Sequence, residues 1–335
     1  MDSKPNDCNA IASFYGVSGK NLQYQYKDFL NDFKIWDQIK HAKDWLLFSK
    51  NIGERLSIDE TSLSNGELYT ILTNKAAKGR KGAIVAMVAG TKAETVIAII
   101  EKIPLKQRNL VTEITLDMAG NMGLIAKKCF PNATRVTDRF HVQKLATEAL
   151  QEIRIKYRWQ AIDQENEAIE KAKKNKKRFG AEVLANGDTL KQLLARSRYF
   201  LYKNKSKWSP SQIERANLLF GLYPDILKAY GLTQDLRNIF EKTTDKIIGF
   251  AKLAKWHEKV SQSGFKSFNT ISRTIINHYQ TILNYFDNRS TNASAESFNA
   301  KIKAFRAQFR GVRNIEFFLF RLTNIYGSIL KVVGK

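Results

Sequence analysis

The sequence predicts an α/β protein in which a mixed sheet with flanking helices is interrupted by a large all-helical insertion. Two observations indicate this. Between about residues 55 and 138, short apolar runs separated by turn signals follow the pattern of strands alternating with short helices. From Phe140 to about Tyr285, charged and apolar residues follow a helical period without a convincing strand. Two further short helical patterns precede the strands.

Composition bounds the class of protein. The chain has 335 residues and is 43% hydrophobic, enough for one large domain or two ordinary ones. It has no run of about 18 apolar residues, so we expect no membrane span, and its first ten residues lack a signal-peptide pattern. Cys8 and Cys129 are too few for a disulfide framework or a four-cysteine zinc site. We therefore expect a cytoplasmic protein.

The net charge is strongly positive. Fifty-five Lys and Arg residues against 32 Asp and Glu give +23. Such an excess favours a polyanionic partner, and nucleic acid fits better than a membrane surface because no strongly apolar amphipathic anchor accompanies the charge. Phosphate contacts would then supply much of the affinity and weaken with salt. The alternative is a basic protein without such a partner.

The N-terminal elements have the layout of a helix-turn-helix. Two short helical patterns, within residues 9–30, flank the turn at Gly16. In this motif the second helix enters the major groove, although an ordinary helical hairpin explains the pattern equally well. The predicted DNA contacts, which lie away from the second apolar stripe, are Lys20, Asn21, Tyr24 and Lys27. Residues 33–54 are predicted to form a linker helix.

The strand pattern begins at Leu56. Two strands surround a hairpin signal at Asn65-Gly66, and a third, at 83–90, is apolar enough for burial on both faces. A helix, a fourth strand at 111–120, a second helix and a short fifth strand follow. The resulting order is β-β-β-α-β-α-β, with three antiparallel strands and two parallel additions. In an RNase H-like sheet of this order, the first and fourth strands are neighbours.

Acidic residues follow these two strands. Asp59 is predicted at the end of the first strand and Asp117 at the end of the fourth, which would bring them together. A third acid, Glu296, lies on a predicted helix whose polar stripe also contains Asn292, Asn299 and Lys303, opposite a phenylalanine stripe that we expect to be buried. A solvated helix face is the alternative for Glu296. Three converging carboxylates would repel one another unless divalent cations lay between them.

Five stretches together resemble the DDE transposases of bacterial insertion sequences, specifically the group with an RNase H-like core and a long helical insertion before the last acid. The resemblance covers roughly residues 10–330, and the Asp-Arg-Phe-His-Val and Asn-x3-Glu-x2-Asn-x3-Lys patterns are its most specific parts. The stretches are IDETSLSNGELYTILTNKAAKGRKG (58–82), ITLDMAGNM (114–122), TRVTDRFHVQKL (134–145), LLFGLYPDILKAYGLTQDLRNIF (218–240) and NASAESFNAKIKAFRAQFRGVRN (292–314).

The resemblance implies that Asp59, Asp117 and Glu296 form an Asp-Asp-Glu triad that binds two Mg²⁺ ions, for which Mn²⁺ would substitute. Two ions about 3.5–4 Å apart activate a water or 3′-hydroxyl and stabilise the leaving oxygen. One centre would therefore cleave a strand at the element end and join the freed 3′-OH to target DNA.

Several residues are secondary candidates. Asp138 and His141 follow the fifth strand: His141 would contact the scissile phosphate or shuttle a proton, or else it only packs at a helix start that Asp138 caps. Asn292 and Asn299, one turn from Glu296, would orient it or contact DNA. The turn at 78–82 is a basic hairpin end near DNA or a plain surface turn. The predicted phosphate contacts around these segments are Lys78, Arg80, Lys81, Lys301, Lys303, Arg306 and Arg310.

The expected partners are double-stranded DNA, as terminal inverted repeats and target, and a second copy of the chain, because two ends must be held together. Longer relatives carry an N-terminal cysteine-rich zinc module that this sequence lacks, so either end recognition is weaker or a separately encoded protein supplies it. We expect action at the bacterial nucleoid. The rival functions are an idle DNA-binding relative and a structure-specific nuclease. The predicted segments are 1–32 (helix-turn-helix), 33–54 (linker helix), 55–148 (first part of the core), 149–287 (helical insertion) and 288–335 (last part of the core).

Overall fold

The structure, a computed structural model, describes residues 6–63, 66–308, 312 and 314–327. These residues form two compact units. One contains the described residues up to Asp138 and those from Arg289 onward, and the other spans 139–288. No helix among the described residues has both the length and the apolar character needed to cross a membrane.

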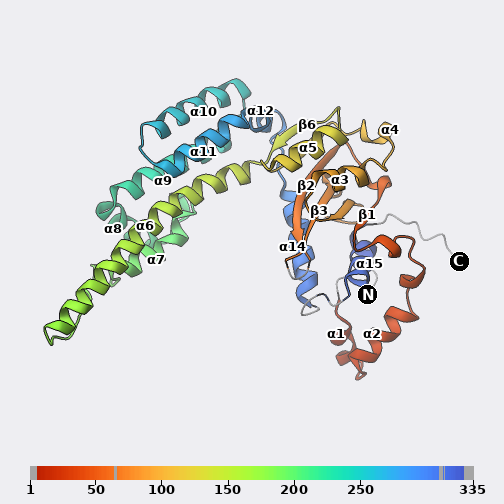
Figure 1. The fold of residues 1–335 in the computed structure, drawn as a ribbon, viewed down its shortest axis with the longest axis horizontal. Coiled ribbons are helices and arrows are strands. Elements are labelled where there is room, and N and C mark those ends of the chain that lie inside the picture. The colour runs from red at the N-terminus through yellow and green to blue at the C-terminus, as the bar shows by residue number, and fades with distance from the viewer. Residues whose placement is uncertain (1–5, 64–65, 309–311, 313, 328–335) are drawn as a thin grey trace. The chain divides into compact units, whose positions relative to one another are not determined.

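The first unit is built around a six-stranded sheet with the order β1-β4-β3-β2-β5-β6 (Figure 1). β2, β3 and β4 are antiparallel neighbours, whereas β5 and β6 are added parallel to β2. This is the strand order and direction of an RNase H-like sheet, so the predicted fold class is confirmed, with β1 as an additional edge strand. The strands are β1 (Trp45–Leu47), β2 (Arg55–Ser62), β3 (Leu68–Asn74), β4 (Ile84–Ala89), β5 (Glu113–Leu116) and β6 (Thr134–Thr137).

Helices cover both faces of this sheet (Figure 1). On one face, Leu56 and Ile58 of β2 join a core with Ile125 of α5. On the other, Ile71 of β3 joins a core with Phe298 of α14. Successive strand residues point to opposite faces, so the apolar runs bury both sides. The helices of this unit are α1 (Cys8–Phe14), α2 (Gly19–Asp28), α3 (Ala93–Ile100), α4 (Leu105–Arg108), α5 (Gly120–Cys129), α14 (Ala293–Gln308) and α15 (Ile315–Tyr326).

The predicted linker helix at 33–54 is wrong. This segment contains short 3-10 turns and the edge strand β1, which pairs with β4 and buries Leu46. Gln38 closes the outer edge of β1: its Oε1 accepts the Leu47 N–H at 2.9 Å and its Nε2 donates to the Leu47 carbonyl at 3.2 Å. These contacts replace helical hydrogen bonds and protect the sheet edge. The turns are η1 (Phe33–Ile35), η2 (Ile39–His41) and η3 (Ser49–Asn51).

The second unit is entirely helical within its described residues. It begins at 139 rather than at 149, because the long helix α6 starts directly after Asp138. Its helices are α6 (Arg139–Lys174), α7 (Leu190–Leu201), α8 (Pro210–Leu222), α9 (Pro224–Lys242), α10 (Lys246–Ser261), α11 (Lys266–Asn277), α12 (Tyr279–Leu283) and α13 (Tyr285–Asn288), with the 3-10 turn η5 (Lys205–Lys207).

A buried carboxylate joins two of these helices. The Asp188 side chain is fully buried, and it accepts hydrogen bonds from Arg196 of α7 and from Arg215 Nε of α8, the latter at 2.8 Å. Burial alone raises the pKa of Asp188, but the hydrogen bonds and charges of Arg215 and Arg196 outweigh it and lower that pKa. The ionised carboxylate therefore stabilises the packing of α7 on α8.

We expect Asp188→Asn to lower the free energy of unfolding at pH 7 by about 2–3 kcal/mol, since the fully buried side chain loses the charge that strengthens its hydrogen bonds with Arg196 and Arg215. Because the folded-state pKa is lowered, the stabilisation exists above the unfolded value of about 3.9 and disappears as pH falls through the folded value. Urea unfolding of the full chain from pH 7 to pH 3 measures the difference. Asp163→Asn, on the exposed part of α6, is the control; an equal loss there, or a loss independent of pH, would contradict the assignment.

Candidate active site

Asp59 and Asp117 lie level with each other on neighbouring strands. The parallel pairing of β2 and β5 ends at Ser57↔Thr115, and each aspartate follows two residues later. The prediction that Asp59 ends its strand is wrong. β2 continues to Ser62 because its antiparallel pairing with β3 persists that far. Alternation directs Asp59 away from the face of Leu56 and Ile58 and toward α14.

Helix α14, which carries Glu296, packs along the same face of the sheet. Phe298, Ile302 and Phe305 are buried against the sheet, as the phenylalanine stripe predicted, whereas Phe309 lies outside the described residues. This packing turns the polar stripe of α14 along β2. Glu296 is exposed on this stripe, so it lies at the rim of the contact between α14 and the sheet.

Two asparagines flank Glu296 on the stripe and bond to β2. Asn292 Nδ2 donates to the Ile58 carbonyl at 3.5 Å. Asn299 Nδ2 donates to Asp59 Oδ2 at 2.7 Å and to the Glu60 carbonyl at 3.4 Å. Because Glu296 lies one turn from each asparagine, its helix face is directed at the part of β2 that carries Asp59. The predicted carboxylates therefore face one region of the sheet.

A fourth acid, Glu60, was missed by the sequence analysis. Burial and the negative charges of Asp117 and Asp59 raise the pKa of Glu60, while a hydrogen bond from Asn121 opposes the shift. The signal was present in the acidic pair at residues 59–60, of which only the first was interpreted. Asp59, Glu60 and Asp117 therefore give a local concentration of negative charge in a basic protein.

The described residues contain no group of three Asp, Glu, His or Cys side chains already arranged around a metal position. The donor chemistry nevertheless fits a divalent cation. Asp59 and Asp117 supply hard carboxylate oxygens on one face, and such oxygens are what Mg²⁺ and Mn²⁺ prefer. Asn292 is fully buried beside them, and its Oδ1 accepts no hydrogen bond within the described part of the chain. Asp59 and Asp117 are therefore residues that could hold a metal, and Glu296 as the third ligand stays a prediction.

Two cations predicted to contact DNA instead attach α14 to the core. Lys301 Nζ donates to the Gly79 carbonyl at 2.8 Å, and Arg306 donates to the carbonyls of Ser62 and Leu63 at 3.3 and 3.2 Å. Lys303 is exposed. Arg310 lies outside the described residues. A DNA role for these residues stays a prediction, and the structure gives the first two a structural role as well.

The basic turn at 78–82 lies beside α14. Gly79 has a φ of 65° and is packed against the helix, with Lys301 Nζ, Ser294 and Phe298 the nearest atoms to the position of a Cβ. The predicted cations Lys78, Arg80 and Lys81 are all exposed around it. The structure therefore gathers exposed positive charge next to the helix that carries Glu296.

The remaining secondary candidates, Asp138 and His141, belong to different units of the chain. Asp138, 1% exposed, follows β6, and its backbone N–H donates to the Leu116 carbonyl at 2.9 Å, so it lies beside the start of the Asp117 loop. His141 belongs to the helical unit, where its ring lies edge-to-face with Phe140 at 5.8 Å. The structure thus brings Asp138 to the sheet edge that carries the acids, and the role of His141 stays a prediction.

The N-terminal helices are docked on the core. α1 and α2 are joined through Gly16, which has a φ of 66°. Lys20, Asn21 and Tyr24 are exposed, but Lys27 lies over the rings of Phe33 and Phe317 at 5.7 and 6.0 Å. Tyr26 also contacts Phe317, so α15 provides the supporting helix that was missing from the sequence pattern. Lys27 is consequently less available to DNA than the other three.

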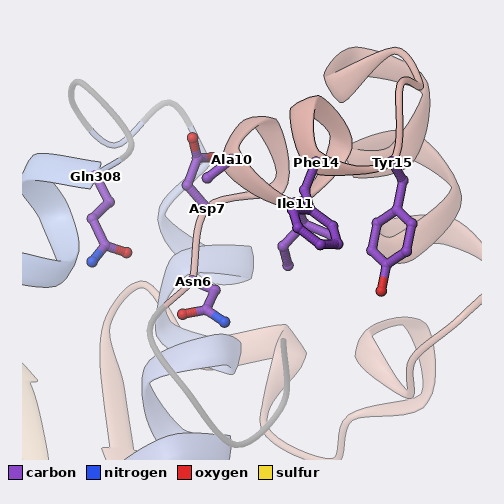
Figure 2. Close-up of a pocket in the computed structure, with 7 residues that line it drawn as sticks. All are labelled: Asn6, Asp7, Ala10, Ile11, Phe14, Tyr15 and Gln308. Atoms are coloured by element: carbon purple, nitrogen blue, oxygen red, sulfur yellow. The ribbon is translucent and has the colours of Figure 1, made fainter.

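A cavity of about 570 Å³ lies beside α1 (Figure 2). Phe14 and Tyr15 on its wall are 83% and 71% exposed. None of the predicted site residues lines it, so it is separate from the carboxylates. The lining residues are Asn6, Asp7, Ala10, Ile11, Phe14, Tyr15 and Gln308.

A buried ion pair links the sheet to the segment that enters α14. Lys75 Nζ lies 3.3 Å from Glu113 Oε1 and donates to Thr115 Oγ1 at 2.8 Å, and Ser290 Oγ donates to the same Glu113 oxygen. Burial lowers the pKa of Lys75, while the charge and hydrogen bond of Glu113 oppose the shift. Sequence reasoning missed these residues because they meet only in the folded chain.

The family model DDE_Tnp_ISL3, described as transposase, matches residues 56–322. The transposase for insertion sequence element IS1001 of Bordetella parapertussis is 24% identical over 226 residues, which cover 66% of this chain and 48% of that protein. The chain therefore spans about half the length of that relative. Among solved structures, a chain of the Drosophila P element transposase strand transfer complex is similar over 96% of this chain and 92% of its own length, with 11% identity and a TM-score of 0.37.

We expect Glu113→Gln to destabilise the protein by about 3 kcal/mol, because Lys75 would keep its charge in a buried place without its partner. The double variant Lys75→Met/Glu113→Gln should recover much of this loss, since no unpaired buried charge remains. Thermal unfolding of the four proteins in this cycle measures the coupling. If the losses of the two single variants simply add in the double variant, the pair is not coupled and the assignment fails.

Proposed function

Since the chain belongs to the DDE_Tnp_ISL3 family of transposases, we propose that it is a DNA transposase that cleaves a strand at the ends of an insertion sequence and joins the freed 3′-hydroxyl to target DNA. The observation that carries this proposal is the convergence on β2: Asp59 and Asp117 are level on one face, and the helix of Glu296 bonds to β2 on both sides of that residue. Asp59, Asp117 and Glu296 act as the catalytic triad.

The triad binds divalent metal, Mg²⁺ by preference, with Mn²⁺ able to substitute and two ions as the expected number. Metal held by these residues would supply the activation of a water or a 3′-hydroxyl and the stabilisation of the leaving oxygen in an in-line displacement. The protein orients the ligands: Asn299 holds Asp59 Oδ2, and the Ala119 N–H donates to Asp117 Oδ1 at 2.9 Å. The Glu60 N–H also donates to Asp59 Oδ1 at 2.8 Å, so these bonds limit the rotation of both carboxylates, as outer-shell partners of metal ligands do.

The substrate is double-stranded DNA, both the terminal inverted repeats and the target. The net charge of +23 supports a polyanionic partner. The exposed Lys78, Arg80 and Lys81 beside α14 are placed to bind phosphates near the triad, and Lys20, Asn21 and Tyr24 of α2 are free to reach DNA. The active form is a homodimer, because two element ends must be held during transfer. A separately encoded protein completes end recognition, and the reaction takes place at the bacterial nucleoid.

Replacing Glu296 tests the reaction. With DNA carrying the ends that flank this gene and Mg²⁺ or Mn²⁺, the wild type should give joined products. Glu296→Gln should reduce joining by more than about 100-fold, because the loss of a direct metal ligand should exceed the upper range for the loss of an outer-shell partner. Gel analysis of labelled strands separates cleavage from joining. Glu94→Gln, an exposed residue of α3, is the matched control and should retain activity. Cleavage without joining would assign a nuclease instead. DNA binding without either step would leave an idle relative or an enzyme that lacks its separately encoded partner, and adding the neighbouring gene product would separate these two.

Metal binding is tested independently of catalysis. We expect Asp59→Asn/Asp117→Asn to weaken Mn²⁺ binding by at least about tenfold, because neutral amides replace the carboxylates. Titration followed by the Mn²⁺ electron paramagnetic resonance signal measures free ion directly. The control Asp163→Asn should bind like the wild type. Equal affinity in all three proteins would place the metal elsewhere and remove the basis of the proposed triad.

A further inference from the structure

The helical unit contains a cavity of about 320 Å³ that the proposed chemistry does not use. Its walls come from the first turns of α6, the end of α7 and the last turns of α9. The lining includes three cations and three aromatic rings, which are Arg139, Lys144, Arg237, Phe140, Tyr202 and Phe240. All of these residues belong to one compact unit, 139–288.

The aromatic part of the lining is open to solvent. Phe140 is 56% exposed and Tyr202 is 43% exposed, whereas Phe240 is buried and stacks on Phe286 at 5.8 Å. Apolar ring surface that remains in contact with water contributes no hydrophobic free energy. A ligand with a flat, apolar surface would therefore gain binding free energy by covering these two rings. Nucleobases stack on such rings without regard to sequence.

The cationic part of the lining is placed for an anion. Arg237 donates to Gln234 Oε1 and to the Tyr202 carbonyl, both at 2.9 Å, so its hydrogen bonds hold it in place through uncharged oxygens. Lys144 is 3.9 Å from Glu148, but both side chains are more than half exposed and such a pair is weak. The lining contains three cations and one carboxylate, Glu241. The cavity therefore attracts negative charge next to its aromatic rings.

The walls are already formed. Gln143 Nε2 donates to the Thr233 carbonyl at 3.2 Å, and Thr233 Oγ1 donates to the Ala146 carbonyl at 3.3 Å, which joins α6 to α9 below the cavity. Thr233 is fully buried. A ligand would enter a site that packing has pre-organised, with little additional cost for ordering side chains.

We propose that this cavity binds one unstacked nucleotide of a DNA strand, with its base against Phe140 and Tyr202 and its phosphate near Arg139, Lys144 and Arg237. The chemistry required is a flat aromatic base joined to a phosphate, which combines the two halves of the lining. A base inside an intact duplex has both faces covered by its neighbours, so the nucleotide must leave the stack to enter. The source of the nucleotide, a DNA strand rather than a free nucleotide, rests on the proposed function.

The test uses the purified full chain and single-stranded oligonucleotides that contain 2-aminopurine, whose fluorescence is quenched when it stacks. Wild type should quench the probe, and Phe140→Ala should weaken binding by about 5- to 100-fold, the effect of losing one stacking ring. Phe140→Leu keeps apolar volume without the ring and should weaken binding similarly. Tyr199→Ala, an equally accessible ring of α7 that is outside the cavity, should bind as the wild type does.

The other possible results of this test either overturn the proposed base site or separate it from the proposed transposase function. If Phe140→Ala and Tyr199→Ala bind the probe as the wild type does, the cavity is not a base site. If Phe140→Ala weakens the binding of an intact duplex as much as the binding of a single strand, the residue is a general DNA contact and the proposal is wrong. If 2-aminopurine nucleoside monophosphate binds as tightly as the oligonucleotide, the ligand is a free nucleotide and the DNA assignment is overturned. If the wild type joins no strands but still quenches the probe in a way that depends on Phe140, the transposase function is rejected and the base site is retained.

Discussion

The hydrogen bond between Asn299 and Asp59 joins two parts of the chain on which the candidate site depends. Asp59 comes with the first long strand of the sheet, and Asn299 comes after the whole helical unit has been completed. The bond lies between two other contacts of α14 with β2, from Asn292 before it and Arg306 after it. Buried phenylalanines supply the free energy of docking, and these polar contacts select its register. A shift of α14 by one turn would break all three of these contacts with β2.

Local pattern was sufficient to predict much of this architecture. The succession of strands and helices along the chain followed from apolar runs and turn signals, and the stripe of α14 followed from residues spaced at the helical period. The pairing of β2 with β5 followed from the RNase H-like arrangement that this succession fits. The segment 33–54 was mistaken for a helix because its strand is short and its edge is satisfied by a side chain, Gln38, rather than by a neighbouring strand. Such a contact leaves no periodic signal in the sequence.

Other features could not be predicted because they depend on residues distant in the chain. Lys75 and Glu113 show no mutual spacing, and their pairing follows only from the sheet topology. Lys301 and Arg306 were interpreted as phosphate ligands from charge alone, yet their hydrogen bonds reach carbonyls of a turn and a strand end. The charge of a side chain indicates that it can bind an anion. Only the folded structure shows which oxygen atoms lie within its hydrogen-bonding distance.

The chain leaves and re-enters the sheet unit beside one strand. Asp138, the last residue before the helical unit, bonds to the end of β5 through its N–H, and Ser290, just after that unit, bonds to Glu113 at the start of β5. Both junctions are thus anchored by contacts that do not involve the inserted helices. A change in the length or number of the inserted helices would therefore leave both contacts of β5 in place, so the insertion has room to diverge in evolution without altering the strand that carries its junctions.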